Sequence, residues 1–111
     1  MSKIALKYKI GREQVQQLVD LYANYLEKAE TGNEHEVLLF SIMQDMYARM
    51  VQLTKAAAVN CILKLTDTEA IAFYQQWSTC DISAWRYADL IVRKILQAID
   101  KKARQYTRTA R

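Results

Sequence analysis

Histidine and cysteine, the side chains that most often bind metal ions or act as nucleophile and base, are scarce in this 111-residue chain. His35 is the single histidine, and Cys61 and Cys80 show no Cys-x-x-Cys spacing. A zinc site needs three or four such ligands, and a catalytic nucleophile needs a base beside it. The sequence also has no Glu-x-x-His pair and no Gly-rich phosphate loop. We therefore expect a non-enzymatic protein that holds no metal or cofactor.

Basic residues at both ends of the chain are the strongest charge feature of a sequence whose net charge is +4. Residues 1–12 carry four bases and no acid, and the two ends would form one basic face if they meet. Nucleic-acid contacts are one interpretation of the C-terminal cations, with an aromatic side chain to stack on a base. The residues concerned are Arg93, Lys94, Lys101, Lys102, Arg104, Tyr106 and Arg108. The other interpretation, which we favour at this point, is that cations at the end of a helix complement its dipole.

Aromatic and apolar side chains supply a second set of candidates, for contact with a protein. Tyr and Trp are enriched at the energetic centres of interfaces. A short strand at residues 3–10 would leave backbone groups unpaired, because no other segment shows the alternation of a strand. It would then pack as an extended arm or pair with its copy in a second subunit; a helical conformation is the third alternative. The candidate interface residues are Ile4, Leu6, Tyr8, Tyr74, Trp77 and Trp85.

The elements that must position these residues are mostly helices. Residues 12–29 carry apolar side chains at spacings of three and four, the stripe of an amphipathic helix. Residues 34–65 are apolar around most of a helix and show no stop signal, so they predict one long central helix, bent near Thr54. Thr66 to Glu69 has the form of a capping box for a short helix. A last helix follows over residues 83–103.

The fold class that these elements predict is all-α: an antiparallel bundle of three long helices plus one short helix. We assign residues 1–111 to one helical domain, with an N-terminal arm at 1–10 and a frayed basic tail at 107–111. The best-defined apolar stripes predict a core that contains Leu18, Met46, Ile62 and Ile95.

Function follows only in outline from these features. No apolar run approaches the length of a membrane-spanning helix, so we expect no membrane contact. A chain with only two cysteines, and no Cys-x-x-Cys spacing, favours a reduced, cytoplasmic compartment. The leading prediction is a helical interaction module that forms a homodimer and binds another protein, because a wide apolar helix and an unpaired strand leave surface to cover. The alternative is an accessory protein that binds nucleic acid through its basic ends.

Overall fold

The computed structural model describes residues 4–56 and 59–109 of the chain, with side chains through residue 105. Its elements follow in the order β1 (Leu6–Gly11), α1 (Arg12–Lys28), α2 (Glu34–Thr54), β2 (Asn60–Leu65), α3 (Asp67–Trp77) and α4 (Arg86–Thr109). The protein is therefore mostly helical, with four helices and one small antiparallel sheet.

The sheet corrects the prediction of a clean all-α bundle. Residues 60–65 form β2, which pairs antiparallel with β1, whereas the sequence predicts a helix through residue 65. The central helix α2 already ends at Thr54, whose hydroxyl donates a hydrogen bond to the carbonyl of Val51. Of the alternatives for the N-terminus, the structure has a strand, at Leu6–Gly11 rather than residues 3–10, and its partner lies in the same chain rather than in a second subunit.

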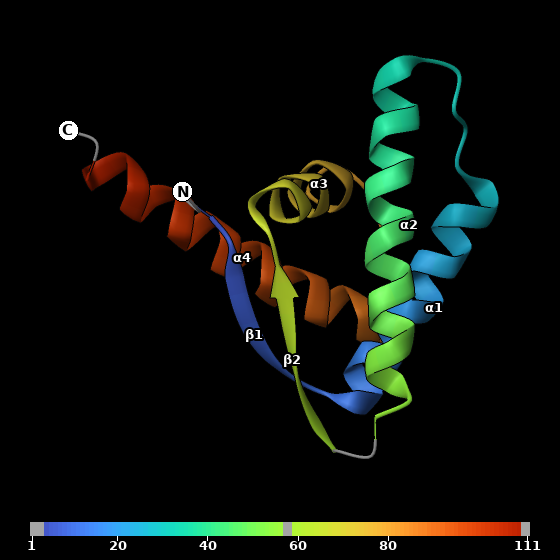
Figure 1. The fold of residues 1–111 in the computed structure, drawn as a ribbon, viewed down its shortest axis with the longest axis horizontal. Coiled ribbons are helices and arrows are strands. Elements are labelled where there is room, and N and C mark those ends of the chain that lie inside the picture. Colours follow the sequence, from blue (N-terminus) through green and yellow to red (C-terminus); the bar gives the residue numbers. More distant parts are fainter. Residues whose placement is uncertain (1–3, 57–58, 110–111) are drawn as a thin grey trace.

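The helices do not stand side by side as an up-and-down bundle. Helices α1 and α2 run in opposite directions, whereas α4 crosses the direction of α2 in Figure 1. The N-terminal end of β1 lies near the C-terminal half of α4, so the first strand and the last helix are neighbours in the fold (Figure 1). Helix α4 includes residues 107–109, for which the sequence predicts a frayed tail, while residues 110 and 111 lie outside the described residues.

One continuous apolar core joins the helices to the inner face of the sheet. Predicted core residues Leu18, Met46 and Ile95 are buried in it, which confirms their stripes. Ile62 is 48% exposed, so its assignment to the core is wrong. The reason is the change of period: in a strand, Ile62 points away from the face that buries Leu63 and Leu65.

The capping box that the sequence predicts at the start of α3 is confirmed. The backbone N–H of Glu69 donates to the Thr66 hydroxyl over 3.2 Å, and the Glu69 carboxylate accepts from the backbone N–H of Thr66 over 3.0 Å. These bonds satisfy two backbone donors that the first turn of a helix leaves without partners.

We expect Thr66→Ala to lower the free energy of unfolding by about 1 kcal/mol, the usual cost of losing a side-chain N-cap. Urea unfolding followed by circular dichroism measures this loss. Thr68→Ala is the matched control, because Thr68 is an exposed threonine two residues further along. An equal loss in both variants would contradict a specific capping role for Thr66.

Candidate functional site

Strand alternation places lysines on the outer face of the small sheet. Lys7 and Lys9 of β1 are exposed, while their neighbours Leu6 and Ile10 are buried. In β2, Lys64 is exposed between the buried Leu63 and Leu65. Because successive side chains of a strand point to opposite faces, one face of the sheet packs on the core and the other presents cations to solvent.

The pairing register brings two of these cations directly opposite each other. Lys7 is the partner of Lys64 across the two strands, and Lys9 is the partner of Ile62. Like charges at directly opposite positions destabilise a strand pair. Repulsion between Lys7 and Lys64 therefore destabilises this strand pair, and the two lysines are exposed rather than packed in the core.

Helix α4 adds two further lysines to the same region. Lys101 and Lys102 lie with Lys7 and Lys64 around an open groove of about 730 Å³ between the sheet and the C-terminal half of α4. A second groove shares Lys64 and continues to Lys9. Neither groove is lined by a carboxylate among the described residues. We call Lys7, Lys9, Lys64, Lys101 and Lys102 together the basic face.

The observed end of α4 removes the helix dipole as the explanation for Lys101 and Lys102. The helix continues through Thr109, so these lysines stand about two turns before its end. The favourable interaction of a cation with a helix C-terminus falls off within the last turn. The later end of the helix is therefore an argument against the interpretation favoured from sequence for this pair, which assumed that the helix ends near residue 103.

The remaining cations that the sequence singles out are placed differently. Arg93 forms an ion pair with Asp89, with its Nε 3.1 Å from the carboxylate, and Arg104 forms one with Asp100. Lys94 lines a separate groove beside α1, together with Glu13. The side chains of Tyr106 and Arg108 lie outside the described residues.

The candidate interface residues divide between core and surface. Leu6 and Trp77 are buried inside the protein, so they are not available for a partner of this fold. The Trp77 ring lies 5.6 Å from that of Tyr22, measured between ring centroids, and its Nε1–H donates to the Tyr22 hydroxyl over 3.4 Å. The side chains of Ile4, Tyr8 and Trp85 are half-buried, and that of Tyr74 is exposed.

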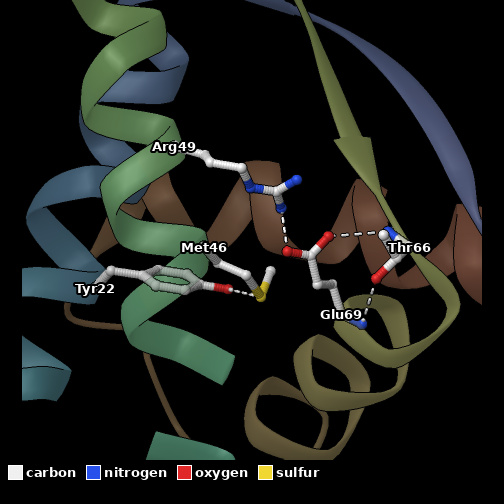
Figure 2. Close-up of polar contacts among 5 residues, drawn as sticks. All are labelled: Tyr22, Met46, Arg49, Thr66 and Glu69. Carbon is white, nitrogen blue, oxygen red and sulfur yellow. Dashed lines mark hydrogen bonds and ion pairs between the residues drawn. The ribbon is translucent and has the colours of Figure 1, made fainter. Parts of the chain in front are cut away.

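A polar cluster between α2 and α3 is accounted for by structural roles. The Glu69 carboxylate accepts from the backbone of Thr66 and from the guanidinium of Arg49, and Figure 2 shows it held between them. In the same view, the Tyr22 hydroxyl points at the sulfur of Met46 over 3.9 Å. Burial raises the pKa of Tyr22 well above its usual range, so this phenol stays protonated near neutral pH. The cluster joins α2 to the start of α3 and offers no ionised nucleophile.

Histidine and cysteine remain separate in the fold. His35 is exposed in the first turn of α2, and Cys80 is exposed after α3. Over residues 4–56 and 59–109, no group of three or more His, Cys, Asp or Glu side chains is placed to hold a metal ion. In the same residues, no helix is both long enough and apolar enough to cross a bilayer.

An apolar groove between α2 and α3 was not among the sites predicted from sequence. It is lined by Leu38, Leu39 and Ile42 of α2 and by Ile71 of α3, with His35 at its edge. Leu38 is 65% exposed, a high value for a large apolar side chain on a helix. The sequence feature that could have indicated this groove is the broad apolar surface of α2. Helices α1 and α3 cover only part of that surface, so apolar side chains such as Leu38 remain exposed.

Comparison with protein-family models, with curated proteins and with solved structures finds no match to the chain. The function of the basic face therefore has to be argued from the residues and geometry of this chain.

Proposed function

We propose that this protein binds nucleic acid without catalysing a reaction, through contacts between the basic face and phosphate groups. The observation that carries the proposal is the convergence of five lysines from β1, β2 and α4 on two adjoining grooves whose described lining holds no carboxylate. Lysine is a common phosphate-binding side chain, and phosphate contacts supply most of non-specific affinity for nucleic acid.

The arrangement of Lys7 and Lys64 supports a binding role over a purely structural one. Side chains kept only for solubility have no need to face a like charge across a strand pair. Elsewhere on α4, Arg93 and Arg104 have carboxylate partners one turn away. A polyanion seated on the basic face would offset the repulsion between Lys7 and Lys64, and the same charges would steer its approach.

The salt dependence of binding tests this proposal. We expect the unmodified protein to bind a labelled DNA duplex, and the logarithm of the association constant to fall linearly with the logarithm of salt concentration. The slope should be about −4 to −5 if all five lysines contact phosphates, at about 0.9 per neutralised phosphate. Fluorescence anisotropy at several salt concentrations between about 50 and 200 mM measures this slope. Absence of binding at about 50 mM salt, or a slope near zero, would refute the proposal.

The second candidate function is self-association, and the apolar groove between α2 and α3 favours it. Exposed Val37, Leu38 and Ile71 lie on or beside this groove, and large apolar patches are uncommon on monomers. A second copy that presents the same groove would bury these residues in a two-fold symmetric contact. We propose this surface in place of the N-terminal strand, which is already paired with β2.

Sedimentation separates a dimer of this kind from a monomer. We expect the unmodified protein to sediment as a dimer and Leu38→Glu to sediment as a monomer, because a charge would be placed in an apolar contact. Leu90→Glu is the matched control: Leu90 is 58% exposed, but it lies on α4 in a different groove. A monomeric unmodified protein, or an unchanged mass for Leu38→Glu, would exclude this interface.

A further inference from the structure

We infer that the basic face binds the phosphate backbone of a duplex and does not read its base sequence. This inference rests on the proposed function and specifies the ligand of the same site. It follows from which side chains the basic face contains, which it lacks, and how densely its charges are placed.

Among the described residues, every cation that lines the two grooves of the basic face is a lysine. Base recognition in the major groove relies on planar side chains that form paired hydrogen bonds, with arginine to guanine as the commonest case. A lysine ammonium acts instead as a point charge that suits phosphate. Two of the arginines of α4, Arg93 and Arg104, form ion pairs with Asp89 and Asp100.

Exposed aromatic side chains lie elsewhere on the described surface. Proteins that bind single strands stack the bases on aromatic rings. Tyr74 is on α3, and Tyr87 lines the separate groove beside α1. Tyr8 lines the groove between the sheet and α4, but its side chain is half-buried and packs against the core. Among the side chains described through residue 105, the basic face thus has no free stacking platform.

The density of charge on the basic face matches a duplex better than a single strand. The Cα atoms of Lys7 and Lys9 are about 7 Å apart along β1, because a strand rises about 3.3 Å per residue. Lys64 lies opposite Lys7, and Cβ atoms at such positions are about 5 Å apart. Lys101 and Lys102 stand across the groove. A duplex presents one charge per about 1.7 Å of axis, twice the density of one of its strands. Packing several cations into one small area therefore gains more from a duplex.

Two duplexes of unrelated sequence, about 20 base pairs long, test the inference, together with the separate strands of each and polyglutamate as a competitor. At about 50 mM salt we expect the two duplexes to bind with affinities within about twofold of each other, and each single strand to bind at least about fivefold more weakly. Polyglutamate at the same concentration of charge should displace little duplex, because its charges are more widely spaced than those of a duplex.

The variant Lys64→Gln tests whether a single lysine of the basic face contacts phosphate. Loss of a phosphate contact should weaken both duplexes by the same factor and make the salt slope shallower by about 1. Single strands that bind as tightly as duplexes, or a duplex preferred more than about tenfold over the other, would overturn the inference while leaving nucleic-acid binding in place. Equal competition by polyglutamate would assign the face to an acidic polypeptide instead. No binding to any nucleic acid would refute the inference and the proposed function together.

Discussion

Ile95→Ala should lower the free energy of unfolding by about 2–5 kcal/mol, the largest effect on stability that we expect from a single substitution in this protein. Ile95 has no exposed surface and lies in the core stripe of α4, with Val92 and Ile99. Removing its larger side chain loses the transfer free energy of the deleted atoms and leaves a cavity. Helices α1 and α3 both pack against α4, and the close packing of a core limits how far it can close around a deleted side chain.

Urea unfolding of the unmodified protein and of Ile95→Ala measures this difference. The free energy of unfolding of each follows from the midpoint of its transition and from the dependence on urea concentration. Leu90→Ala is the control, because Leu90 is a large aliphatic residue on the same helix but is mostly exposed. It should change stability by less than about 0.5 kcal/mol, as exposed positions usually do. A loss below about 0.5 kcal/mol for Ile95→Ala would mean that this stripe does not face the core.

The helices could be predicted from the sequence because their signals are local. The spacing of Val15, Leu18 and Tyr22 specifies one face of α1, and all three are buried. The bonds of Thr66 and Glu69 that start α3 involve residues only three apart. Local hydrogen bonds and a helical period of 3.6 residues are visible in a short window of sequence.

The strand β2 could not be predicted in the same way, because its conformation depends on a distant partner. Cys61, Leu63 and Leu65 alternate with Ile62 and Lys64, but Ile62 makes the segment look like a continuation of an apolar helix. The segment becomes a strand by pairing with β1, whose residues lie 49 to 59 positions before their partners. An isolated run of six residues does not contain that information.

The basic face was only partly accessible from the sequence for a related reason. The cations near both ends of the chain are evident in the sequence. The sequence predicts that they form one basic face only on the condition that the two ends meet. The opposition of Lys7 and Lys64 depends on the register of a long-range strand pair. The choice between dipole and ligand for Lys101 and Lys102 depended on where α4 ends, and helix ends are the least certain part of a sequence-based assignment.

Charge reversal on the basic face is the prediction with the largest expected effect on function. The variant Lys64→Glu, Lys101→Glu, Lys102→Glu should lower the affinity for a DNA duplex more than about tenfold at about 150 mM salt, because three attractive charges become repulsive. Its fold should survive. Reversing Lys64 replaces a like-charge pair with an opposite-charge pair, which favours the sheet by about 0.2–1 kcal/mol.

A second triple variant serves as the matched control. Lys28→Glu, Lys55→Glu, Lys94→Glu has the same net charge, and its three lysines are exposed and lie off the basic face. Its affinity for the duplex should stay within about threefold of the unmodified protein, because only the long-range field changes.

The most direct test of the central claim is therefore one measurement made on both triple variants: anisotropy of a labelled duplex at about 150 mM salt, with the helical circular dichroism of each variant recorded in the same buffer. Our account predicts that the variant with Lys64, Lys101 and Lys102 reversed loses binding while it stays folded, and that the control keeps both. Equal loss of binding in the two variants would show that net charge alone attracts the duplex. Unchanged binding by the first variant would show that the basic face is not the site.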